Sequence, residues 1–267
     1  MTWWQGVVLG LAQGLTEFLP VSSSAHLTLI PWAFGWQDPG LAFDVALHLG
    51  TLVALAIYFR REWVTLAGAG LSIVRHRRIE TPSERMVLWI IVATIPGAVA
   101  GVLFNKWAES TFRSPQLIAA ALATLGVLLW LVDRTASQAR KIDTMGWPSA
   151  IAVGVAQMFA LVPGVSRSGS TITAARWLGF DREAAAVFSF MLSLPIIAGA
   201  VLVEGRHVIR ESPDLTPVLA GLVASAVSGW IAIGVLLRFV LRRSYGAFAV
   251  YRVVLAAGVL ALAWGRP

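Results

Sequence analysis

The sequence predicts an all-α integral membrane protein, and its composition, its apolar segments and its spread of charge all indicate this class. Hydrophobic residues make up 57% of the 267 residues and charged residues only 13%, with a mean hydropathy of +0.74. Soluble domains carry about 25% charged residues. The twelve tryptophans suit the interface between lipid and water. The absence of cysteine excludes disulfides and thiol chemistry.

Six segments are apolar over the length of about 20 residues that a bilayer-spanning helix needs. They are 41–60, 85–105, 115–133, 184–203, 217–237 and 247–264. Two further regions, 3–34 and 147–176, are apolar but are interrupted by Pro-Val or Pro-Gly followed by serines. Broken backbone at membrane depth is tolerated only where protein or a wet cavity surrounds it. We therefore expect six transmembrane helices and two re-entrant helical hairpins.

The basic residues test this topology. The connections 60–85, 134–141, 176–182 and 238–243 hold six, three, two and three of the 21 lysines and arginines. Cytoplasmic loops are enriched in such residues. All four connections lie on one side of the membrane only if both broken regions enter and leave by the same face. The net charge of +7 is thus a topology signal, and we expect no nucleic-acid partner.

An internal repeat relates the two broken regions. Residues 10–28 and 154–172 align without gaps, and both contain the pattern Val-Ser-x-Ser. We predict a single membrane domain, 1–267, built from a first repeat, 1–133, and a second, inverted repeat, 147–267. Inverted repeats place a site near the membrane midplane, where the broken helices meet.

The second hairpin has the residues of a phosphate or diphosphate cradle. Ser166, Ser168 and Thr171 supply hydroxyls, Gly169 lets the backbone approach a ligand, and Arg167 offers a fork of donors. The alternative is that these small residues only allow helices to pack closely. Close packing does not explain an intramembrane arginine, which is costly and functional by default.

The first hairpin contains groups for acid–base or metal-assisted phosphoryl transfer. Glu17 and His26 flank Ser22 and Ser23, and Gln13 lies one helical turn before Glu17. His26 is a candidate nucleophile or general acid, and Ser23 a candidate nucleophile. Glu17, with Gln13 on the same helical face, is a candidate either to hold a hard divalent cation, which prefers oxygen donors, or to position an attacking water.

Asp44, His48 and Arg252 are among the other polar residues of the predicted spans. Asp44 and His48 are one turn apart, and a place in the same cavity and a purely structural role are equally compatible with the sequence. Arg252 lies near the start of the last span, where its side chain is expected to snorkel to the surface, and no role follows for it.

The stretches QGLTEFLPVSSSAH (13–26) and PGVSRSGST (163–171) resemble the two signature motifs of the bacitracin-resistance type of undecaprenyl-pyrophosphate phosphatases. FDVALHLGTL (43–52) and FSFMLSLP (188–195) are similar to the family too, so the resemblance spans most of the chain. Many members have Glu where this chain has Gln13, so a metal site with two carboxylates does not carry over.

The resemblance implies a bacterial inner-membrane enzyme that hydrolyses undecaprenyl diphosphate to undecaprenyl phosphate and inorganic phosphate, recycling the cell-wall lipid carrier. It further implies a divalent cation, Mg²⁺ or Ca²⁺, an active site on the outer side, and a homodimer. Carried over by motif, the catalytic set is Glu17, Ser23, His26 and Arg167; the substrate-binding residues are Gln13, Ser22, Ser166, Ser168, Gly169 and Thr171.

The alternative is a secondary transporter or flippase of an anionic lipid or solute. Inverted repeats with broken helices are common in transporters. In that case Glu17 and His26 couple protons, and Arg167 binds an anion without cleavage.

Overall fold

The computed structural model describes residues 1–211 and 215–265, so the last two residues of the predicted second repeat lie outside the described residues. The first half contains α1 (Trp3–Glu17), α2 (Ser23–Phe34), α3 (Gly40–Tyr58), α4 (Arg60–His76), α5 (Pro82–Thr111) and α6 (Pro115–Thr135). The second half contains η1 (Ile142–Thr144), α7 (Trp147–Met158), η2 (Phe159–Leu161), α8 (Arg167–Trp177), α9 (Arg182–Glu211), α10 (Thr216–Val240) and α11 (Gly246–Trp264). The described ranges contain no β-strand, only an isolated bridge between Arg140 and Phe180. The all-α prediction is confirmed.

Five helices are long and apolar enough to cross a membrane: Pro82–Phe104, Pro115–Thr135, Arg182–Val203, Thr216–Val240 and Gly246–Trp264. Each coincides with a predicted span. The predicted span 41–60 qualifies only when α3 is taken together with α4, from which it is bent by 84°. The regions 3–34 and 147–176 are broken helices, interrupted at the Pro-Val and Pro-Gly positions.

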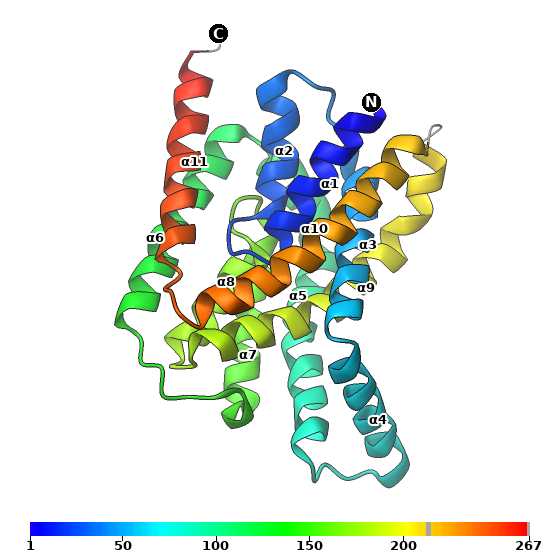
Figure 1. Cartoon of the computed structure of the whole chain (residues 1–267), viewed down its shortest axis with the longest axis vertical. Helices are drawn as coiled ribbons and strands as arrows, with labels where there is room; N and C mark the ends of the chain where they lie inside the picture. Colours follow the sequence, from blue (N-terminus) through cyan, green and yellow to red (C-terminus); the bar gives the residue numbers. More distant parts are fainter. Residues whose placement is uncertain (212–214, 266–267) are drawn as a thin grey trace.

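The helices of the two halves pack in matching pairs (Figure 1). Helix α1, which begins the first broken region, packs on α10. Helix α7, which begins the second broken region, packs on α5. Helix α3 packs on α9, and α6 on α11. The start of α1 and the end of α11 lie at one end of the molecule, and the α4–α5 hairpin projects from the opposite end (Figure 1).

Glycines of α1 allow its close approach to α10. Gly6, Gly10 and Gly14 are spaced by four residues and so share one face of the helix. A Cβ atom on Gly6 or Gly10 would collide with backbone of α10, at Pro217 or Gly221. Small residues at this spacing are typical of helix pairs in membranes, where close backbone contact replaces the hydrophobic driving force.

A buried carboxylate joins three of the four basic connections. Asp133 accepts hydrogen bonds from Nε of Arg176 at 2.8 Å, Nε of Arg182 at 2.9 Å and the backbone N–H of Tyr245 at 3.0 Å. Lys141 pairs with Asp181 at 2.6 Å in the same region. These contacts bring the connections after α6, α8 and α10 to the same end of the molecule.

We expect Asp133→Ala to lower the free energy of unfolding by about 3–5 kcal/mol, because it leaves the fully buried Arg176 without a counter-ion. Thermal unfolding of the purified protein in detergent measures the effect. The control is Gln138→Ala, an exposed position in the following connection, for which the change should stay within about 0.5 kcal/mol. Equal stability of the two variants would contradict the role given to Asp133.

Candidate active site

The break in the first hairpin is stabilised by serine. Helix α1 ends at Glu17, and α2 begins at Ser23. Between them Ser22 adopts a φ of 74°, which is rare for a residue with a side chain. Its hydroxyl accepts a hydrogen bond from the N–H of Ala25 and so caps α2.

The second hairpin repeats this arrangement. Ser166 adopts a φ of 75°, and its hydroxyl accepts a hydrogen bond from the N–H of Gly169, which caps α8. In each hairpin the capping hydroxyl lies 3.2 Å from that of the serine two residues later, Ser24 or Ser168. The Val-Ser-x-Ser pattern thus gives the same local structure twice, and it places Ser23 and Arg167 at the first positions of the returning helices.

The two hairpins meet at Glu17. Its Oε2 accepts hydrogen bonds from the Ser23 hydroxyl at 2.6 Å and from Nε2 of Gln13 at 3.0 Å. Its Oε1 lies 3.1 Å from Nη2 of Arg167, on the other hairpin. Nε2 of His48, from α3, lies 3.4 Å from Oε2. Four of the predicted site residues therefore gather in one cluster, and His48 joins them.

Backbone contacts fix the two hairpins to each other around this cluster. The hydroxyl of Ser168 lies 2.9 Å from the carbonyl oxygen of Leu19 and 3.2 Å from that of Glu17. Nη1 of Arg167 donates to the carbonyl of Ser189 on α9 at 3.1 Å. The guanidinium is therefore held from one side by α9 and from the other by Glu17.

The remaining residues of the predicted phosphate cradle are buried and bound to the protein. The hydroxyl of Thr171 donates to the carbonyl of Arg167 and lies 2.7 Å from the hydroxyl of Ser189. Those of Ser22, Ser166 and Ser168 make the contacts described above. The structure therefore gives these four hydroxyls structural hydrogen bonds in addition to any contact with substrate.

His26 is near the cluster in sequence but faces a different group. Its Nδ1 lies 2.7 Å from the carbonyl of Ser22, and its Nε2 lies 2.6 Å from the hydroxyl of Tyr251 on α11. Both residues border an apolar groove of about 420 Å³ between α2 and α11, lined further by Leu29, Trp32, Val254 and Leu262 among others. His26 thus links the site to an apolar surface instead of contacting Glu17 directly.

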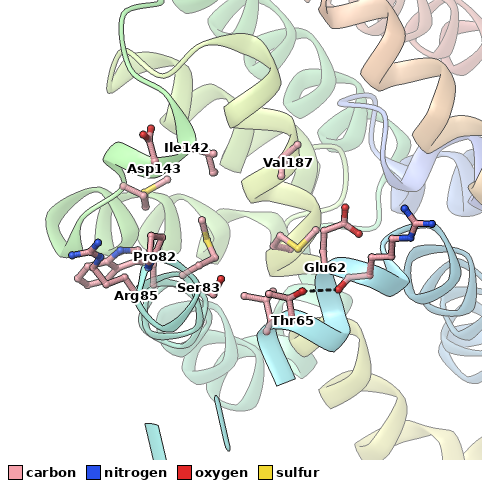
Figure 2. A pocket seen from close by; sticks show the side chains of 14 residues that line it. Glu62, Thr65, Pro82, Ser83, Arg85, Ile142, Asp143 and Val187 are labelled. Carbon is pink, nitrogen blue, oxygen red and sulfur yellow. Dashed lines mark hydrogen bonds between the residues drawn. The ribbon is translucent and has the colours of Figure 1, made fainter. Parts of the chain in front are cut away.

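A cavity of the same volume, about 420 Å³, lies at the opposite end of the molecule, between α4, α5, α9 and η1 (Figure 2). Its charged lining residues are Arg61, Glu62, Arg85 and Asp143, two of each sign, around an apolar floor. None of the predicted site residues lines it. Balanced charge gives no basis for gathering a diphosphate, so we do not assign the chemistry to this cavity.

Two buried atoms in the Glu17 cluster have no hydrogen-bond partner, Oε1 of Gln13 and Nε of Arg167. Buried polar atoms are normally paired, so unpaired ones require an explanation. An amide oxygen suits a hard cation and a guanidinium N–H suits a phosphate oxygen. The described residues contain no group of three His, Cys, Asp or Glu side chains that would bind a metal by themselves. Glu17 and Gln13 therefore fit a cation whose remaining ligands come from substrate.

The expectation for Arg252 is wrong. Its side chain does not snorkel to the surface but is fully buried, and it donates to backbone carbonyls of both hairpins. It also occupies the space beside Gly169: a Cβ there would lie 2.8 Å from Nη1 of Arg252. The gap that was expected to admit a ligand is therefore filled by a guanidinium. A sequence signal existed, because Arg252 shares the buried face of α11 with Ala249, Ala256 and Val259.

Comparisons with known proteins show the family of this chain. Residues 6–258 match the family model described as bacitracin resistance protein BacA. The chain belongs to the BacA family. Among similar BacA proteins, the undecaprenyl-diphosphatase of Gemmatimonas aurantiaca is 57% identical over 261 residues, which cover 98% of each chain. The undecaprenyl-diphosphatase of Moorella thermoacetica is 48% identical over the full length of both chains, and that of Pelotomaculum thermopropionicum is 45% identical over 100% of this chain and 98% of its own.

Ser168→Ala in this BacA protein should lower the free energy of unfolding by about 1–3 kcal/mol, since it leaves buried carbonyls at the hairpin contact without a donor. Ser24→Ala, at the equivalent position of the first hairpin, is the matched control. Ser24 is only partly buried and its hydroxyl is close only to Ser22, so the expected change is within about 0.5 kcal/mol. Chemical denaturation in detergent distinguishes the two, and a larger loss for Ser24→Ala would refute the assignment.

Proposed function

We propose that the chain hydrolyses undecaprenyl diphosphate to undecaprenyl phosphate and inorganic phosphate, and so recycles the lipid carrier of cell-wall synthesis. The names of its full-length relatives support this activity. The observation that carries the proposal is the contact of Glu17 and Ser23, from one hairpin, with Arg167, from the other. This cluster combines a hydroxyl (Ser23), a carboxylate base (Glu17) and a guanidinium that can bind phosphate (Arg167).

Ser23 is the nucleophile that the geometry favours. Its hydroxyl donates to Glu17 at 2.6 Å, so the carboxylate can take the proton as the oxygen attacks. A bond forms between Ser23 Oγ and the terminal phosphorus, and the bond to the bridging oxygen breaks, so that undecaprenyl phosphate leaves with the electron pair. Water then attacks the phosphoserine. Ser23 Oγ leaves with the proton held by Glu17, and both protons of the water stay on the released phosphate, which departs as H₂PO₄⁻.

Arg167 binds the phosphates in this mechanism. Its unpartnered Nε and its Nη2 donate to phosphate oxygens on which charge accumulates during transfer. Glu17 and Gln13 would hold a divalent cation, Mg²⁺ or Ca²⁺, which would neutralise phosphate charge. His26 is the second candidate nucleophile, and its Nε2 must first exchange the hydrogen bond to Tyr251. The hydroxyls of Ser22, Ser166, Ser168 and Thr171 shape the phosphate site.

The membrane topology in this proposal is six transmembrane helices with two re-entrant hairpins in an inverted repeat. The matching helix pairs, α1 on α10 and α7 on α5, support the repeat. The basic connections support the orientation: three meet at Asp133, and the fourth shares the cavity of Figure 2 with η1. We place this end in the cytoplasm of the bacterial inner membrane and the active site toward the outer side. We also propose that the enzyme is a homodimer.

Purified protein should release phosphate from C55 or C15 polyprenyl diphosphate, and EDTA should abolish the release until Mg²⁺ or Ca²⁺ is restored. Alanine at Glu17, Ser23 or Arg167 should each lower kcat by about 10²- to 10⁴-fold, because each removes a base, a nucleophile or a charge-stabilising donor. Ser24→Ala, in the same serine run, is the control and keeps wild-type activity. Folded wild-type protein without activity under any cation would refute the proposal and favour transport, to be measured in liposomes.

Single cysteines test the topology, because the chain has none of its own. In right-side-out spheroplasts, Gln37→Cys and Thr111→Cys should react with a membrane-impermeant maleimide. Glu80→Cys, Ala139→Cys and Arg242→Cys should react only after permeabilisation. All five positions are exposed, so accessibility to water does not differ among them. Labelling of the two groups from opposite faces is required; labelling of all five from one face would exclude the six-span arrangement.

A further inference from the structure

Arg252 lies in the interior of the molecule, at a point where α11 passes the breaks of both hairpins. Its side chain has no exposed surface, although it is one of the largest and most polar in the chain. A buried guanidinium is costly unless its donors are satisfied. The contacts that satisfy it therefore indicate what it does.

The donors of Arg252 reach three separate segments. Nε donates to the carbonyl of Leu122 on α6 at 3.1 Å. Nη1 donates to Pro20, in the break of the first hairpin, at 3.2 Å. Nη2 donates to Gly164 and Val165, in the break of the second, at 2.8 and 3.1 Å. One planar group thus holds both breaks and anchors them to α6.

These carbonyls need such a donor. Pro20, Gly164 and Val165 lie between helices, so their carbonyl oxygens have no intrahelical partner, and a membrane interior offers no water to replace it. Lysine could not serve equally, since it has three donors on one atom, whereas arginine has five spread over a rigid plane.

The position of the guanidinium is also fixed from the side of α8. Gly169 faces Nη1 of Arg252, and a methyl group there would approach it to 2.8 Å. Gly169 is two residues from Arg167, on the same short helix. A displacement of Arg252 is therefore transmitted to the helix that begins with Arg167.

Arg252 differs from Arg176, the other fully buried arginine of the described residues, in having no carboxylate partner. Arg176 is equally buried but pairs with Asp133. Arg252 takes part in none of the ion pairs found among the described residues, and its hydrogen bonds there all go to backbone carbonyls. A role in an internal ion pair therefore does not explain it.

We propose that Arg252 is a positioning residue of the active site. It holds the first break, which carries Glu17 and Ser23, in register with the second, which carries Arg167. This inference rests on the proposed hydrolysis. In this role Arg252 sets the distance between the Ser23 hydroxyl and the Arg167 guanidinium, although its own side chain touches neither the substrate nor the reacting atoms.

The test compares Arg252→Lys with Arg176→Lys, two conservative changes of fully buried arginines, by kcat, KM and thermal unfolding in one detergent. Arg252→Lys should lower kcat about 100-fold with KM within about twofold, because a misplacement of about 1 Å costs that much in rate. Arg176→Lys should lower the unfolding temperature and leave kcat, measured well below that temperature, within about threefold of wild type. Unchanged kcat in Arg252→Lys would overturn the proposal.

A double-mutant cycle separates positioning from general damage. If Arg252 acts through the placement of Arg167, the double variant Arg252→Lys/Arg167→Lys should lose less kcat than the product of the two single fold-losses. The fold-losses in kcat of Arg176→Lys and Arg167→Lys should multiply. Independent losses for Arg252 and Arg167 would contradict the inference.

Gly169→Ala serves if Arg252→Lys fails to fold, because it displaces the guanidinium without removing it. It should lower kcat in the same way, and Gly199→Ala, where a Cβ meets nothing within 4 Å, is its control. Wild-type kcat in Gly169→Ala counts against the proposal. Failure of wild-type hydrolysis refutes the proposed function instead, so the two failures are distinguishable.

Discussion

Satisfaction of backbone polar groups at the two broken helices is the constraint on which the rest of this structure depends. Each break leaves N–H and carbonyl groups that lipid cannot solvate. Ser22 and Ser166 cap the returning helices, Ser168 donates to carbonyls at the end of α1, and Arg252 donates to carbonyls of both breaks. The serine-rich motifs and a buried arginine thus make irregular backbone possible inside an apolar protein.

The same constraint creates the candidate active site. Because the breaks place Ser23 and Arg167 at the first positions of α2 and α8, the Glu17 carboxylate of one hairpin can pair with the guanidinium of the other. Removed from water, such groups interact strongly and keep their orientation. This cluster needs both halves of the chain, one for the carboxylate and one for the guanidinium.

Two buried networks of charge in this protein have different purposes. In the Asp133 network the arginine donors and carboxylate oxygens are satisfied by neighbouring side chains and backbone. The Glu17 network leaves Gln13 Oε1 and Arg167 Nε without partners. The first is complete by itself and joins helices; in the proposed mechanism, substrate and a cation would complete the second. None of the residues that line the cavity of Figure 2 has a buried polar side-chain atom without a partner, which separates that cavity from the candidate site.

The sequence by itself determined the helical membrane class, five of the spans, the two breaks and the cluster of Gln13, Glu17, Ser23 and Arg167. Composition, the length of the apolar segments and the local serine motifs encode these features within short stretches of chain. Only the tertiary structure decided the roles of His26 and Arg252, which depend on Tyr251 and on carbonyls more than 80 residues away in sequence. A buried arginine and a snorkelling one look alike in sequence, because what surrounds the side chain is set by helix packing.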